Sequence, residues 1–223
     1  MKPHILTFHG HDLHLYPSGA LYWPDQGLLC ISDLHLGKSE RMARRGGALL
    51  PPYETRETLQ RLDDQINQTQ AVRVVCLGDS FDDSAALDGL DSGERQWLTR
   101  MMAGREWIWI AGNHDAGPLD ISGTHRSELA IQAITFRHEP IPTAVAEVSG
   151  HFHPKHRHAG QSFRCFLVDQ SRIILPAFGT YTGGLVSSDR AFSPLLSSGA
   201  LAVLCLSSSA ICVPLNRSST RSR

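Results

Sequence analysis

The order of segments between residues 28 and 111 is the feature that most restricts the fold of this chain. Apolar, β-rich runs occupy residues 28–32, 72–77 and 107–111, and each is closely followed by Gly, Asp or Asn. Between the first two runs, apolar residues recur at helical spacing, and residues 92–102 repeat this pattern between the second and third. Alternation of strand and helix favours a parallel sheet with right-handed crossovers, so we expect an α/β sheet here.

The segments on either side are β-rich. Before residue 28, strands are expected at 5–8, 11–16 and 20–23, as a meander. After Asn113, strands are expected at 130–136, 144–149, 163–168 and 172–175, followed by a hairpin of 201–206 with 211–215. These predict a second sheet packed on the first.

Composition and length restrict the function classes. No composition shift divides the chain, so we expect one domain over residues 1–215 and a solvated tail over 216–223. The 21 Lys and Arg nearly balance the 22 Asp and Glu, so any binding of a polyanion must be local.

The cellular setting is also predicted from the sequence. Residues 191–216 are uncharged, but the serines at 207–209 divide them into two short β-like runs, which favours a hairpin over a membrane span. The N-terminus has no signal-peptide pattern. The five cysteines lack CxxC spacing and are expected to be reduced, as in a cytoplasmic protein.

Polar residues of a restricted set of types follow the predicted strands. Because ligands bind at the carboxyl ends of strands in open α/β sheets, one crevice is expected to collect these residues. They are Asp33, His35, Asp79, Asn113, His114, Asp115, His138, His151 and His153.

Their chemistry suits a pair of divalent cations. Carboxylate and amide oxygens with imidazoles, and no thiolate, favour Mn²⁺, Fe or Zn²⁺. Asp79 lies in the sequence between the pair Asp33 and His35 and the pair His151 and His153, and it is expected to bridge ions about 3.5–4 Å apart that share an activated water. Each motif alone could equally be a turn or a cap, but the four motifs in this order favour a metal site.

This ordered set resembles the signature of the calcineurin-like metallophosphoesterases, which runs Asp-x-His, Gly-Asp, Gly-Asn-His-Asp/Glu, a His and Gly-His-x-His. The resemblance implies a two-sheet β-sandwich flanked by helices in four layers. It implies one metal held by Asp33, His35, Asp79 and His153, and another held by Asp79, Asn113, His138 and His151. His114 would be the catalytic histidine that binds no metal, and Asp115 would orient it.

A closer resemblance is to the ligase-associated DNA damage response endonucleases (PdeM). It is carried by Leu-Gly-Lys at 36–38, Leu-Pro-Pro-Tyr at 50–53, Gly-Asp-Ser-Phe at 78–81, Arg-His-Glu-Pro at 137–140 and Leu-Pro-Ala-Phe-Gly at 175–179. It implies action on single-stranded DNA or DNA ends in repair, with Mn²⁺ as the first choice of metal, and a DNA ligase and a helicase as partners. Asp82 stands where related enzymes often have His, which puts a secondary contact of this loop in doubt.

A cationic segment follows the first metal motif. Lys38, Arg41, Arg44 and Arg45 are candidates to bind phosphates that flank the scissile one. The alternative is a solvated helix face. Tyr181 is expected either to stack on a base at the cleft rim or to be a buried structural residue.

The sequence thus predicts a phosphodiesterase or endonuclease that cleaves DNA by in-line attack at a dinuclear centre. Two alternatives stay open at this stage. The same site could serve a small-molecule phosphatase or nucleotide-pyrophosphate hydrolase. A non-catalytic scaffold is the third reading, although such a protein typically loses a ligand or the catalytic histidine.

Overall fold

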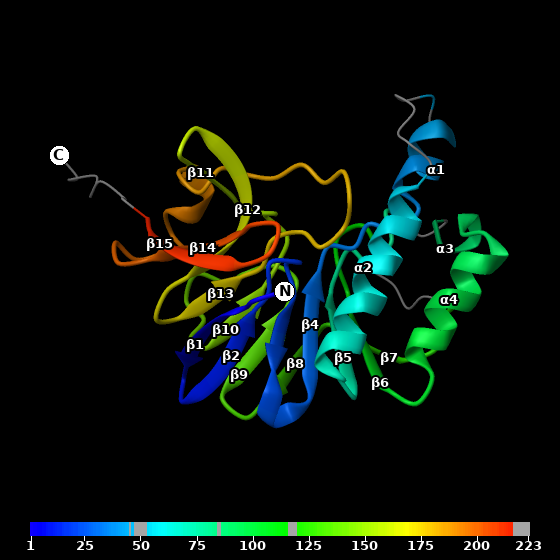
Figure 1. The fold of residues 1–223 in the computed structure, drawn as a ribbon, viewed down its shortest axis with the longest axis horizontal. Helices are drawn as coiled ribbons and strands as arrows, with labels where there is room; N and C mark the ends of the chain where they lie inside the picture. Colours follow the sequence, from blue (N-terminus) through cyan, green and yellow to red (C-terminus); the bar gives the residue numbers. More distant parts are fainter. Residues whose placement is uncertain (45, 47–52, 84–85, 116–119, 216–223) are drawn as a thin grey trace.

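The structure is a computed structural model that describes residues 1–44, 46, 53–83, 86–115 and 120–215. Two β-sheets face each other, and helices cover the outer side of one of them (Figure 1). The predicted tail at 216–223 lies outside the described residues.

The first sheet contains the predicted alternation of strands and helices. Its strands lie side by side in chain order, antiparallel from β1 to β4 and parallel from β4 to β7. They are β1 (His4–Phe8), β2 (His11–Leu15), β3 (Leu21–Trp23), β4 (Leu28–Ser32), β5 (Arg73–Leu77), β6 (Glu106–Ile110) and β7 (Thr124–Arg126). A short 3₁₀ turn, η1 (Pro24–Gln26), joins β3 to β4. The meander and the parallel strands were both predicted and are confirmed.

Helices pack on the outer face of this sheet (Figure 1). They are α1 (Lys38–Arg44), α2 (Glu54–Thr69), α3 (Ala86–Gly89) and α4 (Ser92–Met102). Helix α2 buries Leu59, Leu62 and Ile66 in this layer, as their spacing predicts. A capping box formed by Asp91 and Glu94 begins α4, which explains why it starts at Ser92.

The second sheet has the strand order β15-β14-β12-β13-β10-β9-β8, and β11 pairs with β12 beside this path. Its strands are β8 (Glu128–Ile131), β9 (Ile134–Arg137), β10 (Glu147–Ser149), β11 (Lys155–His158), β12 (Gln161–Val168), β13 (Arg172–Ile174), β14 (Leu201–Cys205) and β15 (Ala210–Pro214). The predicted terminal hairpin is therefore confirmed as β14 and β15. No helix in the described ranges is long and apolar enough to cross a membrane.

The main core lies between the two sheets. Trp23 of the first sheet stacks on Phe136 of the second, with their ring centroids 6.5 Å apart. On the outer face of the second sheet, the 3₁₀ turn η2 (Arg190–Phe192) and the following leucines cover a further apolar cluster. These layers match the expected sandwich.

Three local expectations were wrong or incomplete. The strand expected at 130–136 is the hairpin of β8 and β9, because the chain turns at Gln132, whose φ is 52°. Of the strand expected at 144–149, only Glu147–Ser149 is extended. Strands β7 and β11 were not expected, since their polar sequences carry no apolar alternation. The cysteines are free, as predicted.

Candidate metal centre and active site

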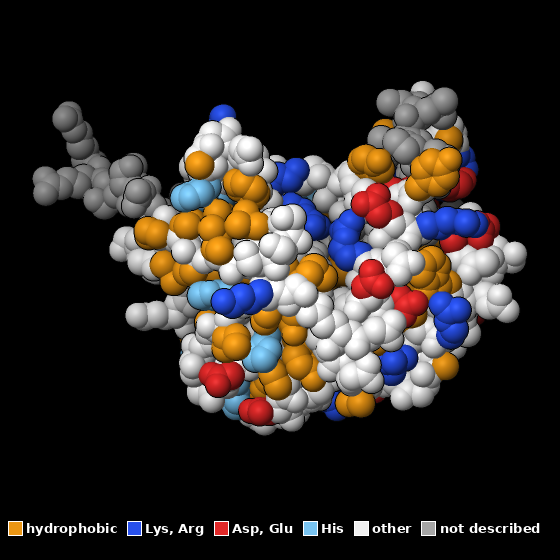
Figure 2. All heavy atoms as spheres, viewed as in Figure 1, with side chains coloured by type: hydrophobic (Ala, Val, Ile, Leu, Met, Phe, Trp, Pro, Cys, Tyr) orange, Lys and Arg blue, Asp and Glu red, His pale blue; other side chains and the backbone are white. Residues whose placement is uncertain are grey.

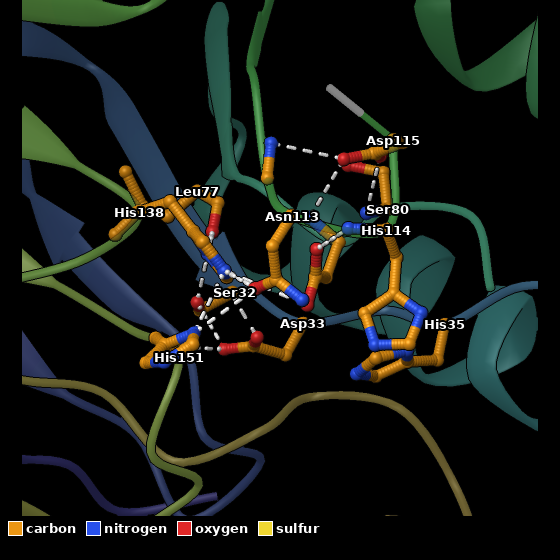
Figure 3. Close-up of polar contacts among 12 residues, drawn as sticks. Ser32, Asp33, His35, Leu77, Ser80, Asn113, His114, Asp115, His138 and His151 are labelled. Carbon is orange, nitrogen blue, oxygen red and sulfur yellow. Dashed lines mark hydrogen bonds and ion pairs between the residues drawn. The ribbon is translucent and has the colours of Figure 1, made fainter. Parts of the chain in front are cut away.

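The loops that follow β4, β5, β6, β9 and β10 meet at one place, at the carboxyl ends of these strands. The nine polar residues that the sequence analysis named are spread from position 33 to position 153. The structure brings them together. Figure 3 shows the side chains of Asp33, Asn113, His138 and His151 pointing toward one another. The convergence expected from strand ends is therefore present.

The backbone at this place is strained. Asp33, His35, Asp79, His151 and His153 all have φ between 46° and 71°. Left-handed backbone costs a non-glycine residue roughly 1–2 kcal/mol and is concentrated at functional sites. Gly150 allows the close approach of these loops, because a Cβ on it would lie 1.7 Å from Ser32 Oγ. The fold thus holds these side chains in conformations that the residues do not favour by themselves.

One group of candidate ligands contains Asp33, His35 and His153. His153 Nε2 lies 3.0 Å from Asp33 Oδ1 and 3.4 Å from His35 Nε2. Asp33 is fully buried, and the imidazole nitrogens near its Oδ1 do not form a hydrogen bond of good geometry with it in the described part of the chain. A buried carboxylate oxygen without a hydrogen bond is costly, and a cation beside it would remove that cost.

A second group surrounds His138. Its Nδ1 donates to the Leu77 carbonyl at 2.8 Å, which turns Nε2 toward Asn113 Oδ1 at 3.0 Å and Asp79 Oδ2 at 3.5 Å. His151 Nδ1 lies 3.1 Å from the same Asn113 oxygen and 3.2 Å from His138 Nε2. Two imidazole nitrogens and two oxygens thus face one point.

The electrostatics of the site favour positive charge. Burial raises the pKa of Asp79, but the hydrogen bond and charge of His138 outweigh it, so the pKa of Asp79 is well below its usual range. Burial lowers the pKa of His138, yet the carboxylates of Asp79 and Asp33 raise the pKa of that imidazole to about 9. The pKa of Asp33 is lowered too, since His153 and His138 outweigh its burial. These shifts mean that the buried carboxylates stay ionised and favour positive charge beside them.

These donors fit a divalent metal. They are carboxylate and amide oxygens with imidazole nitrogens, a set that borderline and harder divalent ions prefer. Asp33 belongs to both groups, as it also clusters with Asp79 and His138. Asp79 as the bridge between two ions stays a prediction.

His114 lies at the exposed side of this site, with its ring edge-to-face against His35 at 5.2 Å. Its Nδ1 donates to the Asp82 carbonyl at 2.9 Å, and its backbone N–H donates to Asp79 Oδ1 at 2.8 Å. The first of these bonds leaves Nε2 as the ring nitrogen that is free for a bound molecule. His114 thus has the position expected of a residue that meets substrate.

The expected role of Asp115 needs correction. Its buried carboxylate accepts hydrogen bonds from the backbone N–H groups of Gly112, Asp79, Ser80 and Phe81, at 2.7 to 3.2 Å. The ring of His114 is instead held by the Asp82 carbonyl. Asp115 therefore joins the loops that follow β5 and β6, because a carboxylate in a nest of N–H groups is satisfied there and does not reach the imidazole.

Asp82 makes the secondary contact that its identity had put in doubt. Its Oδ1 accepts from His35 Nδ1 at 2.9 Å, and its Oδ2 pairs with Arg41 Nε. Asp82 is fully buried. A carboxylate behind a ligating histidine is a common outer-shell arrangement, so an acidic residue three positions after Asp79 was a usable signal.

Two of the predicted phosphate-binding cations, Arg41 and Arg44, form ion pairs. Arg41 pairs with Asp82, and Arg44 pairs with Glu40 at 3.0 Å and with Asp83 at 3.1 Å. Lys38 begins α1, and Arg45 lies outside the described residues. A role of these four residues in substrate binding stays a prediction.

This chain is similar to one known protein family and to one solved structure described below. Residues 28–176 match the family described as calcineurin-like phosphoesterase. The chain is also similar to the crystal structure of Pseudomonas putida nuclease MPE, with a TM-score of 0.71 and 28% sequence identity over 92% of this chain and 97% of that one. No curated protein matches the sequence.

Proposed function

Because this chain belongs to the calcineurin-like phosphoesterase family and is a metal-dependent phosphoesterase, we propose that it hydrolyses phosphodiester bonds in DNA. The observation that carries this proposal is the convergence of the Asp33 and His138 groups of ligand atoms beside the exposed imidazole of His114. The similarity to a solved protein whose title calls it a nuclease supports a phosphodiester substrate.

Divalent ions bound to these groups would neutralise charge on the phosphoryl oxygens and activate a water for in-line attack. We assign them to the ligand sets expected from the resemblance, with Mn²⁺ as the first choice. The residues of the chain do the positioning. Asp82 and the Leu77 carbonyl fix the rings of His35 and His138 by accepting from their Nδ1 atoms, which leaves each Nε2 for coordination.

We assign His114 to the leaving group. With Nδ1 bonded to the Asp82 carbonyl, Nε2 of this exposed residue is left to present a proton to the departing oxygen when the ring is protonated. The bond from Nδ1 to the Asp82 carbonyl fixes the ring, and the bond from the His114 backbone N–H to Asp79 Oδ1 fixes its backbone. This role needs no contact between His114 and metal.

The test is an assay of purified protein with added Mn²⁺ on three substrates: bis-p-nitrophenyl phosphate, p-nitrophenyl phosphate and single-stranded DNA. We expect cleavage of the diester and of DNA, and little action on the monoester. Monoester hydrolysis alone would make the protein a small-molecule phosphatase. No turnover with Mn²⁺, Fe²⁺ or Zn²⁺ would support a non-catalytic scaffold.

DNA is the partner that this proposal requires. Action in DNA repair with a DNA ligase and a helicase, and a cytoplasmic location, stay predictions that depend on the family resemblance and on the cysteine usage.

A further inference from the structure

The segment of residues 177–187 runs beside two loops of the candidate metal centre, those that carry Asp33 and His153. Phe178 and Gly179 donate backbone hydrogen bonds to the carbonyls of Ser32 and Asp33, at 2.8 and 3.0 Å. Farther along, Gly184 lies so close to His153 that a Cβ on it would be 2.0 Å from the His153 carbonyl oxygen. We call this segment the strap, and both its ends contact loops that carry candidate ligands.

Cations from three separate elements converge on the strap. Arg61 of α2 donates to the Phe178 carbonyl at 2.5 Å, and Arg164 of β12 donates to the Ala177 carbonyl at 3.0 Å. Lys155 of β11 donates to the Thr182 carbonyl at 3.2 Å. Lys155 and Arg164 are register partners, so their side chains lie on the same face of the hairpin.

These charges are poorly neutralised. Within the described part of the chain, neither Lys155 nor Arg164 has a carboxylate partner, and the partner of Arg61 is the exposed Glu57 at 3.3 Å. Arg61 and Arg164 are close enough that, after burial, the charge of Arg164 is the next cause that lowers the pKa of Arg61. Arg41 and Arg44 of α1, by contrast, are paired with acids. Uncompensated positive charge on a surface attracts anionic ligands.

The shape of the surface agrees with an extended ligand. Figure 2 shows Lys and Arg side chains gathered in the hollow between the β11–β12 hairpin and α2. Tyr181 lies at the turn of the strap with φ of 55° and is 48% exposed. An exposed aromatic ring beside uncompensated cations is the combination used to bind single-stranded nucleic acid, by stacking and by phosphate contacts.

We infer that Lys155, Arg61 and Arg164 form a phosphate-binding track that holds single-stranded DNA against the strap, with Tyr181 as a stacking platform for one base. The track binds phosphates next to the scissile one, since Lys155 is two residues from His153. This inference rests on the proposed function and names the side on which the strand enters the site.

The test compares two double variants. Lys155→Gln/Arg164→Gln removes two charges from the track and keeps an amide donor for each strap carbonyl. The matched control, Arg73→Gln/Arg100→Gln, removes two charges from surface ion pairs on β5 and α4. Arg164→Lys, which keeps the charge, tests whether charge itself is needed.

The main readout is the affinity for a fluorescent twelve-nucleotide dT strand in Ca²⁺, measured by anisotropy between 50 and 200 mM NaCl. We expect the track variant to bind about ten-fold more weakly and the slope of log Kd against log salt to fall by about 1.4, since each lost contact to a single strand contributes about 0.7. The control variant and Arg164→Lys should stay within about two-fold of the parent. Tyr181→Ser should weaken binding, and Tyr181→Phe should not.

A second readout separates this inference from the proposed function. Bis-p-nitrophenyl phosphate is too short to span the track, so the track variant should lose a much smaller factor in its hydrolysis than in DNA affinity, and the control variant should hydrolyse it within about two-fold of the parent. Unchanged DNA affinity and salt slope in the track variant, or an equal loss in the control, would overturn the track while diester turnover upholds the phosphodiesterase. A parent protein that fails to bind the strand overturns the track as well, whereas failure of the parent to hydrolyse any diester counts against the proposed function alone.

Discussion

The Asp82 carboxylate accepts a hydrogen bond from Nδ1 of His35 at 2.9 Å, and both side chains are buried. This bond fixes the ring so that Nε2 faces His153, whose Nε2 lies 3.4 Å away. The orientation of a candidate ligand on the loop after β4 is thus decided by a residue on the loop after β5.

We expect Asp82→Ala to lower metal affinity about 10- to 100-fold, because His35 loses the acceptor that orients it. Isothermal titration calorimetry measures this effect when Mn²⁺ is added to the variant after its metal has been removed with a chelator. Asp88→Asn, which alters an exposed carboxylate, is the control and should leave the affinity unchanged. Equal affinities for Asp82→Ala and the parent would mean that His35 needs no such support.

Asp79 and His114 should separate metal binding from turnover. Asp79→Asn removes a carboxylate from the candidate ligands, so we expect loss of metal occupancy and nearly all activity. His114→Ala should keep both metals and lose roughly 10²–10⁴-fold in kcat, the usual contribution of a proton donor. Metal analysis of each purified variant beside its diesterase rate tests this, and a metal-free His114→Ala protein would show that the two roles are assigned wrongly.

The free energy of unfolding of the metal-free protein should fall as the pH rises through the weakly basic range. His138 has a pKa raised to about 9, since Asp79 and Asp33 outweigh burial. The protonated His138 therefore stabilises the folded state. This contribution, up to about 3 kcal/mol, is complete below about pH 6.5, the ordinary pKa of His, and is lost as the pH rises toward 9. Urea unfolding in EDTA at several pH values measures it. His138→Asn should abolish this loss, and a slope that persists in the variant would assign it to another group.

The Arg172 and Glu147 pair should matter for stability. Arg172 Nη1 lies 3.2 Å from Glu147 Oε1, both side chains are buried, and the same guanidinium donates to the carbonyls of Ile141, Pro142 and Ala144. Arg172→Met should cost about 3–5 kcal/mol of unfolding free energy, because it leaves Glu147 buried without this partner.

Arg73→Met is the control for that variant. It alters a pair with the exposed Glu106 and should cost less than about 1 kcal/mol. Urea unfolding of both variants gives the two values, and equal costs would show that burial of the Arg172 pair adds nothing.

Much of the fold follows from local pattern. The apolar runs that became β4, β5 and β6 and the spacing of Leu59, Leu62 and Ile66 were sufficient, because buried parallel strands and amphipathic helices each have a characteristic periodicity. The hairpin of β8 and β9 was missed, since the turn at Gln132 has neither Gly nor Asn to mark its positive φ.

The sequence by itself determined which residue types gather at the centre: Asp33, Asp79 and the histidines follow strands whose ends must meet at one sheet edge. Only the tertiary structure decided which residue accepts a hydrogen bond from which, and so which residue orients which. Contacts between distant segments set these roles. Asp82 accepts from His35, Asp115 accepts from backbone N–H groups of another loop, and Arg164 and Lys155 donate to carbonyls of the strap. Hydrogen-bond partners depend on distances and angles across the fold, which residue order alone does not contain.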